Sequence, residues 1–320
     1  MHNWSIRAAS HCAIDVIPYS LPLSEKEEIV ERVGLIVLDL DGTVLSPAGH
    51  VTRRTRAAIR AAVDARIAVC IATGRSWWES RSVIAEAELT GPGLFAGGAI
   101  VNQMESGATL GVMPMHAEVA RRACAVIDRQ GLAAMVLRDR NVEKYEWLIA
   151  GEWPMPPTVP EWLATHGSSF ARANGLADAD HRGTVRLSTV AVIEENQRMA
   201  EALTAELGEA VYLHEICVPT AGVSVLEVFD STVNKWTGVQ RAAAMLGVDE
   251  RTIIAIGDDM NDLPMLRGAA VGVAMGQARH EVKTAANVTI GTNAVDGLAK
   301  YLEQIVTAGG TLASAREWNE

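Results

Sequence analysis

The sequence predicts an α/β protein in which a doubly wound, Rossmann-like parallel core sheet is interrupted by an inserted α/β domain. The apolar run at residues 35–38 is typical of a strand buried on both faces of a parallel sheet. A second run at 67–72 follows a helical stretch from 52 to 65, and this order implies a right-handed crossover between parallel strands. Further short apolar segments, separated by helical stretches, occur late in the chain at 223–229, 252–256, 270–274 and 288–290.

The domain boundaries follow from a change of pattern in the middle of the chain. Between about 96 and 220 the strand and helix signals are mixed, and prolines gather near 154–160. A sheet interrupted by an insertion is the economical interpretation. We expect a short charged helix near 24–32. The predicted parts are an N-terminal extension at 1–32, a core at 33–95 and 221–308, an inserted α/β domain at 96–220, and a C-terminal tail at 309–320.

Composition limits the possible partners and compartments. A formal net charge of −11 argues against a nucleic-acid partner, which normally meets a basic face. The four cysteines form no CxxC pair, so a reduced cytoplasmic location is the simplest expectation. No apolar run approaches the roughly 20 residues that a membrane span needs, and the first residues do not resemble a signal peptide. The sequence carries no indication of oligomeric state.

Two carboxylates follow the first predicted strand. Asp39 and Asp41 are two residues apart, so on an extended backbone both side chains point the same way. This position lies beyond the carboxyl end of a strand, where open α/β sheets bind ligands. Carboxylates this close repel each other, so either one holds a proton or a cation lies between them. An ordinary turn of Asp-x-Asp-Gly composition is the structural alternative.

A second acidic segment follows the strand predicted at 252–256. Its residues are Gly257, Asp258, Asp259, Met260, Asn261 and Asp262. Acidic groups at the ends of two strands would leave unneutralised anions clustered at one sheet edge, which a purely structural explanation does not account for. Carboxylate oxygens suit a hard cation, so the two segments together predict a Mg²⁺ site.

Two further features are compatible with phosphate binding. Thr73 and Gly74 follow the second strand, and Ser76 with Glu79 fits a capping box that starts a helix there. Backbone N–H groups at that point, with the Thr73 hydroxyl, suit a phosphate group. Lys235 lies near the start of a helix after the 223–229 segment, where a lone lysine is otherwise a solvated surface residue.

Taken together, these motifs resemble those of the haloacid dehalogenase superfamily. Asp-Leu-Asp-Gly-Thr at 39–43, Thr-Gly-Arg at 73–75, Lys235 and Gly-Asp-x-x-Asn-Asp at 257–262 occur in the superfamily's order. Within it, the chain looks like the Cof-type (class IIB, C2-capped) sugar-phosphate phosphatase branch, over residues 33–305. The resemblance implies a Rossmann-like core with a large α/β cap, here 96–220, that sets substrate specificity.

The resemblance also implies a role for each matching residue. Asp39 would be the nucleophile that forms an aspartyl phosphate, and Asp41 would protonate the leaving alcohol and then activate water. Mg²⁺ would be held by Asp39, the Asp41 main-chain carbonyl and Asp258. Asp262 would orient Lys235 or a metal-bound water. The groups expected to bind the transferring phosphoryl oxygens are Thr73, Gly74, Lys235 and Asn261.

The expected function is that of a Mg²⁺-dependent phosphatase acting on a small phosphorylated metabolite, with a sugar phosphate as the default by family analogy. Pyridoxal phosphate, a flavin mononucleotide or a nucleotide intermediate remains open as the substrate. A phosphohexomutase-type phosphotransferase shares the same motifs and remains an alternative. A catalytically silent phosphate-binding module is a third. No specificity motif is evident in the cap. The cap candidates are Trp147, Trp153, Trp162, His166 and Arg186, each equally explicable as cap core or surface.

Overall fold

The computed structural model describes residues 31–150 and 155–318. Residues 31–320 form one compact unit, which is described here by itself. Most of the N-terminal extension predicted at 1–32, with its expected helix near 24–32, lies outside the described residues. Trp153 also lies outside them. The last residues of that extension are described, and there Arg32 forms an isolated bridge with Thr311.

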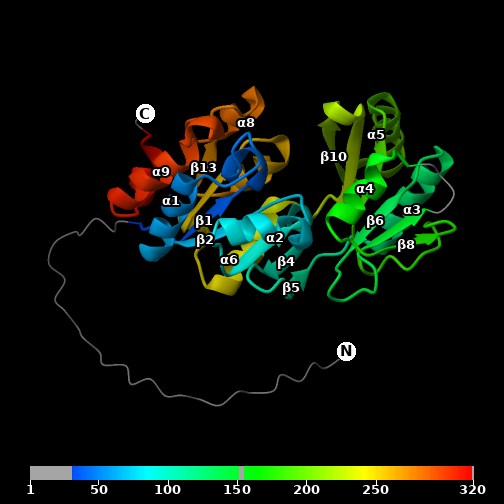
Figure 1. The fold of residues 1–320 in the computed structure, drawn as a ribbon, viewed down its shortest axis with the longest axis horizontal. Helices are drawn as coiled ribbons and strands as arrows, with labels where there is room; N and C mark the ends of the chain where they lie inside the picture. The colour runs from blue at the N-terminus through cyan, green and yellow to red at the C-terminus, as the bar shows by residue number, and fades with distance from the viewer. Residues whose placement is uncertain (1–30, 151–154, 319–320) are drawn as a thin grey trace, which may run out of the picture. The chain divides into compact units, whose positions relative to one another are not determined.

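A parallel sheet forms the core, as predicted (Figure 1). It has five strands in the order β14-β13-β12-β1-β2. Its register pairs Leu38 with Ile256 on one side and with Ile71 on the other. The strands are β1 (Leu35–Leu38), β2 (Ala68–Ile71), β12 (Ile253–Gly257), β13 (Val271–Ala274) and β14 (Val288–Thr289).

Helices cover both faces of this sheet, which explains why β1 is apolar without interruption. Leu35 and Val37 pack in a cluster with residues of α6 and α7, whereas Ile36 and Leu38 pack with residues of α1 and α9. Successive side chains of a strand point to opposite faces, so both sets are buried. The helices of this half are α1 (Arg53–Asp64), α2 (Trp77–Glu86), α6 (Lys235–Leu246), α7 (Leu263–Gly268), α8 (His280–Ala285), α9 (Gly297–Thr307) and α10 (Leu312–Arg316).

A small antiparallel sheet continues the core beyond β2. Ala72 bridges Leu94 in parallel, and β3 (Pro92–Phe95) pairs with β4 (Ile100–Gln103), which pairs with β5 (Thr109–Val112). The predicted start of the insertion at 96 falls inside the β3–β4 connection, so these two later strands are still attached to the core. The chain enters the second large sheet only after β5.

The second large sheet is mostly antiparallel and has the order β10-β11-β9-β6-β7-β8. Helices α3 (Ala117–Arg129) and α5 (Ile193–Leu207) lie against one face and contact each other, and α4 (Thr158–Thr165) lies between β7 and β8 in the sequence. Its strands are β6 (Met135–Arg138), β7 (Trp147–Ala150), β8 (Phe170–Ala173), β9 (Thr184–Ala191), β10 (Val211–Val218) and β11 (Val223–Asp230).

The assignment of 223–229 to the core sheet is wrong. This segment is β11, which pairs antiparallel with β10 and β9 in the six-stranded sheet. It resembles a core strand because it carries apolar side chains on both faces. Leu226 and Val228 pack with α3 and α5, and Val225, on the opposite face, lines a cavity. Apolar character reports burial on two faces and does not report which strands are the partners.

The expected helix starts near the site are confirmed. The Thr52 side chain accepts a hydrogen bond from the Thr55 N–H at the start of α1. Ser76 and Glu79 form the predicted capping box at the start of α2. Trp236, which follows Lys235, packs against Gly268, where a Cβ atom would lie 2.3 Å from the indole. The bulky Trp236 therefore fits at this position because Gly268 of α7 has no side chain.

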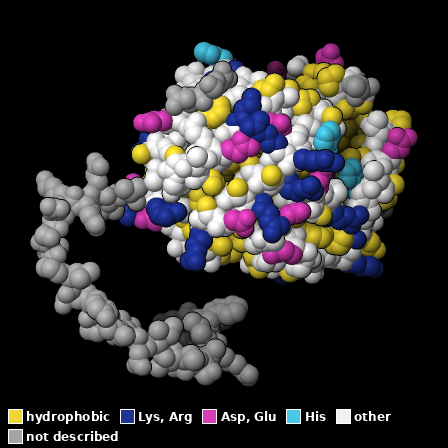
Figure 2. Space-filling view, turned by 60° about the vertical axis from the view of Figure 1, so that its left-hand side comes forward, with side chains coloured by type: hydrophobic (Ala, Val, Ile, Leu, Met, Phe, Trp, Pro, Cys, Tyr) yellow, Lys and Arg dark blue, Asp and Glu magenta, His cyan; other side chains and the backbone are white. Residues whose placement is uncertain are grey.

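The surface of the described residues carries charges of both signs. On the face shown in Figure 2, basic and acidic side chains are interspersed among hydrophobic and neutral ones. Among the described residues, no helix combines the length and apolar character needed to cross a bilayer. Cys70 and Cys124 are buried and Cys217 is exposed, and all three are free thiols.

Candidate active site

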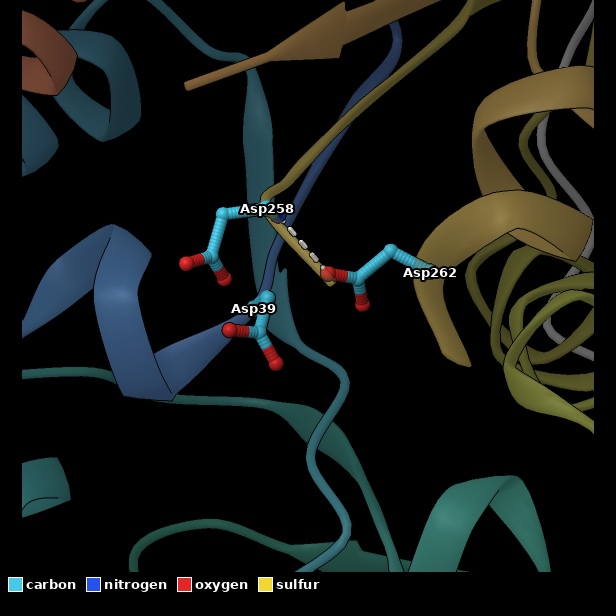
Figure 3. Close-up of side chains that lie close together, drawn as sticks. All are labelled: Asp39, Asp258 and Asp262. Atoms are coloured by element: carbon cyan, nitrogen blue, oxygen red, sulfur yellow. Dashed lines mark hydrogen bonds between the residues drawn. The ribbon is translucent and has the colours of Figure 1, made fainter. Parts of the chain in front are cut away.

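The two acidic segments meet because β1 and β12 are adjacent and parallel. Their carboxyl ends share one edge of the sheet, and the Asp39 N–H donates to the Ile256 carbonyl at 2.9 Å. Carboxylate oxygens of Asp39, Asp258 and Asp262 lie within 4.8 Å of one another (Figure 3). The predicted grouping of Asp39 with Asp258 is therefore present in the structure.

Gly42 allows this close approach. Its φ is +86°, a left-handed conformation that L side chains rarely adopt. A Cβ atom here would lie 2.1 Å from Asp258 Oδ2. The turn after Asp39 therefore requires glycine both for its backbone angle and for the space occupied by Asp258.

Lys235 is fully buried between two of these carboxylates. Its Nζ donates to Asp39 Oδ1 and to Asp262 Oδ1, each at 2.6 Å. Asn234 fixes the lysine at the first turn of α6, because its side chain accepts from the N–H groups of Trp236 and Thr237. Burial alone would lower the pKa of Lys235, but the two carboxylates outweigh it and raise the pKa, so the side chain is a cation.

One lysine does not balance three carboxylates. Burial is the largest cause that raises the pKa of Asp39 well above its ordinary range, and Asp262 and Asp258 add to it, while Lys235 opposes it. Burial and the neighbouring Asp262 also raise the pKa of Asp258 to about 6. Asp258 Oδ1 is buried and has no hydrogen-bond partner. A hard divalent cation fits this donor set, because it would satisfy that oxygen and neutralise the excess charge.

Asp262 is the least available of the three carboxylates for a cation. Its Oδ1 accepts from Lys235, and its Oδ2 accepts from the N–H groups of Asp258 and Asp259 at 2.8 and 3.0 Å. These bonds hold the loop after β12 in place. Asp39 and Asp258 therefore suit direct coordination better, and Asp262 is placed to orient Lys235.

Asp41 is exposed and does not join the buried cluster. Its carboxylate is paired bidentately with Arg75, whose Nε donates to Oδ2 at 2.8 Å. Arg75 belongs to the Thr-Gly-Arg motif at 73–75, and this contact links that motif to a predicted catalytic residue. The contact gives Asp41 an ionic partner on the loop that follows β2.

Three of the four predicted phosphate-binding residues line one cavity. Thr73, Gly74 and Asn261 line a cavity of about 580 Å³ together with Asp39 and Asp41. Lys235 is not part of the lining, but it contacts the lining residue Asp39 through the bond described above. The Thr73 hydroxyl accepts from the Arg75 N–H at 3.1 Å, which fixes the loop.

The six-stranded sheet contributes a charged network that the sequence did not reveal. Arg186 pairs with Glu227, and its Nη1 donates to the Gly74 carbonyl at 2.7 Å. His214 Nδ1 lies 3.2 Å from Glu227 Oε2, and its Nε2 lies 3.6 Å from Asp259 Oδ2. Burial alone would lower the pKa of His214, yet these carboxylates raise it to about 9.

These contacts join the six-stranded sheet to the two core loops that carry the motifs. The His214 contact also lowers the pKa of Asp259 to about 2. Asp259 had no predicted role. Its partner His214 belongs to β10, and the sequence does not show that β10 approaches this loop.

Gln277 is a further residue of the site that the sequence did not reveal. Its Nε2 donates to the Gly42 carbonyl at 2.5 Å and lies 3.3 Å from Asp258 Oδ2. Its Oε1 accepts from the Asn293 N–H at 3.2 Å. Gln277 therefore connects the two acidic loops at the expected cation site.

The cap candidates differ in their positions. Trp147, Trp162 and Arg186 line the cavity, and the two indole rings meet edge to face with centroids 5.7 Å apart. His166 stacks at a tilt on Trp162, with ring centroids 5.2 Å apart, and so supports it from behind. Trp153 lies outside the described residues.

With the geometry established, comparisons with known proteins define the class. The family model described as haloacid dehalogenase-like hydrolase matches residues 36–302, so the chain belongs to this family. The predicted superfamily, fold class and enzyme class, a phosphoric monoester hydrolase, are confirmed.

Individual relatives match over nearly their whole length. The Bacillus subtilis 5-amino-6-(5-phospho-D-ribitylamino)uracil phosphatase YitU is 28% identical, over 84% of this chain and 96% of that protein. The Escherichia coli pyridoxal phosphate phosphatase YbhA is 24% identical, over 84% and 97%. The structure of the subclass IIB sugar phosphatase BT4131 has a TM-score of 0.67 and 21% identity, and it covers 84% of this chain and 98% of its own.

Proposed function

We propose that this chain is a Mg²⁺-dependent phosphatase that hydrolyses a small phosphorylated metabolite through an aspartyl phosphate on Asp39. The observation that supports this most strongly is the buried Asp39–Lys235–Asp262 arrangement beside the unpartnered oxygen of Asp258. Asp39 also lines a cavity large enough for a metabolite. The names of the relatives, which include phosphatases of ring-bearing metabolites and of sugars, support the substrate class.

In this proposal Asp39 attacks the phosphorus atom and takes the phosphoryl group, while the bond to the leaving oxygen breaks. Phosphoryl transfer demands alignment and charge neutralisation more than covalent chemistry. Lys235 supplies both: its 2.6 Å bonds to Asp39 and to Asp262 hold the Asp39 carboxylate in place, and its positive charge lies directly beside that nucleophile. Mg²⁺ bound by Asp39, Asp258 and the Asp41 main-chain carbonyl would supply the positive charge that lets a carboxylate approach an anionic ester.

Asp41 is proposed as the acid and then the base. It would give a proton to the leaving alcohol oxygen and later take one from the water that attacks the aspartyl phosphate. Its exposed position at the cavity and its pairing with Arg75 mean that the carboxylate must turn away from Arg75 to do so. Arg75 would hold Asp41 at the mouth of the site between turnovers.

The phosphoryl oxygens are proposed to meet Thr73, Gly74, Lys235 and Asn261. Thr73 and Gly74 follow β2, and Asn261 follows β12, so these groups approach from both sides of Asp39. Their support is positional: all but Lys235 line the cavity, and Lys235 contacts the nucleophile.

Release of phosphate from p-nitrophenyl phosphate, with Mg²⁺ and then with EDTA, tests the proposal. Wild type should turn over only with the cation, and Asp39→Asn should be inactive while retaining the wild-type fold. The matched control is Asp64→Asn, which removes an exposed carboxylate at the end of α1 and should leave turnover unchanged. Metal-independent turnover, or none from folded wild type, would refute the proposal.

The phosphomutase alternative is separated by product analysis. A phosphatase releases inorganic phosphate from glucose 1-phosphate or another hexose phosphate without any bisphosphorylated activator. A mutase would give an isomeric sugar phosphate and would depend on that activator.

A further inference from the structure

One face of the six-stranded sheet forms the roof of the cavity. Side chains alternate along a strand, so residues two apart share a face. On β9 this places Arg186 and Ser188 toward the cavity, while Leu187 packs against the helices on the opposite face. The same alternation brings Val225 and Glu227 of β11 to the cavity. The lining is therefore a regular product of strand register.

The part of this lining that comes from the six-stranded sheet and α4 is largely apolar, with polar exceptions that include Arg186, Ser188, His214 and Glu227. Met135, Trp147 and Val225 come from the sheet, and Val159 and Trp162 come from α4. Apart from the indole N–H groups, these five side chains offer no partner to the hydroxyl groups of a sugar, and each desolvated hydroxyl that stays unpaired is costly. A flat ring, by contrast, buries its faces against indole and aliphatic surfaces without that cost.

Two buried polar atoms in the same lining lack a partner. Arg186 is 4% exposed and Ser188 is 2% exposed, and neither Arg186 Nε nor Ser188 Oγ has a hydrogen-bond partner. The other end of the Arg186 guanidinium is held by Glu227 and by the Gly74 carbonyl, so Nε remains as a fixed donor. Buried polar groups are almost always paired, so this pair indicates a ligand with a hydrogen-bond acceptor.

We infer that the leaving group of the substrate is a flat, unsaturated ring that carries a hydrogen-bond acceptor, bound against Trp147 and Trp162 and read by Arg186 and Ser188. This inference rests on the proposed phosphatase function and narrows its substrate class. Among the substrate types that the sequence leaves open, it favours a phosphate ester on a flat, unsaturated ring over the default sugar phosphate.

Three esters of primary alcohols test the inference, because their intrinsic phosphate chemistry is similar. Pyridoxine 5′-phosphate has a flat ring with acceptors, benzyl phosphate has a flat ring without them, and glucose 6-phosphate has a saturated polyhydroxylated ring. With wild type and Mg²⁺, kcat/KM should fall in that order. The opposite order, with glucose 6-phosphate the best substrate, would overturn the inference and leave the phosphatase function intact.

Ser188→Ala supplies the second arm. It should lower kcat/KM for pyridoxine 5′-phosphate roughly two- to tenfold more than for benzyl phosphate, the size of one hydrogen bond, mainly through KM. Ser168→Ala is the matched control, because its hydroxyl is also buried and unpaired but lies outside the cavity lining. Equal losses on both ring esters would refute an acceptor contact. If folded wild type hydrolyses none of the esters, nor p-nitrophenyl phosphate, the phosphatase function itself fails.

Discussion

Replacing Lys235 by methionine should destabilise the protein strongly in the absence of a divalent cation. Methionine keeps the apolar length of the side chain but removes the ammonium that contacts Asp39 and Asp262 at 2.6 Å. Breaking a buried ion pair by removing one partner costs about 3–5 kcal/mol, because the remaining charge stays buried and uncompensated. Two carboxylates lose their partner here, although protonation of Asp39, whose pKa is already raised by burial, limits the loss.

Urea unfolding in EDTA at neutral pH measures this effect. Lys300→Met, which removes an exposed lysine on α9, is the matched control and should change stability by no more than about 0.5 kcal/mol. With saturating Mg²⁺ the loss in Lys235→Met should shrink, because a cation bound to Asp39 and Asp258 replaces part of the missing charge.

A double variant tests the reasoning most severely. Asp39→Asn removes one of the carboxylates that Lys235→Met leaves uncompensated, so the combined loss should be smaller than the sum by more than about 1 kcal/mol. A loss below about 1 kcal/mol in Lys235→Met, or additive losses in the double variant, would refute the charge balance described for this cluster.

Two other predictions concern the contacts around the site. The pKa of His214 is raised from 6.5 to about 9, so its contribution to stability is fully present below pH 6.5 and is lost as the pH rises through 9. Urea unfolding in EDTA should therefore show the stability difference between wild type and His214→Gln falling by up to about 3 kcal/mol over that range, and a difference independent of pH would contradict the pairing. Gln277→Ala should weaken Mg²⁺ binding about tenfold in calorimetric titration, because the side chain orients the Gly42 carbonyl and Asp258; unchanged affinity would show that this contact is not needed.

The sequence predicts the positions of Asp39 and Asp258 well because each residue directly follows a strand of the parallel sheet. Asp39 and Asp258 each follow a buried apolar strand directly, and strands β1 and β12 pair in register. Knowing that both strands belong to one parallel sheet is enough to bring their carboxyl ends together. Lys235 needs more, since its helix must return to that edge, and only the family motif order indicated it.

The placement of β11 and the cavity lining could not be predicted in the same way. An apolar strand covered on both faces has the same pattern in a parallel core and in a sheet that roofs a cavity. Arg186 and Ser188 reach the cavity lining only because β9 pairs with β11 on one side and with β6 on the other. Those antiparallel pairings join residues far apart in the sequence.

The central claim, that Asp39 carries the phosphoryl group, is tested most directly by trapping the intermediate. Wild type is mixed with Mg²⁺ and a phosphate ester, quenched in acid within one turnover and digested. The mass of the peptide that contains Asp39 is then measured by mass spectrometry. The account predicts a fraction of that peptide heavier by one phosphoryl group, lost in Asp39→Asn and present in Asp64→Asn. Phosphate release by wild type without any modified Asp39 peptide, or turnover retained by Asp39→Asn, would contradict it.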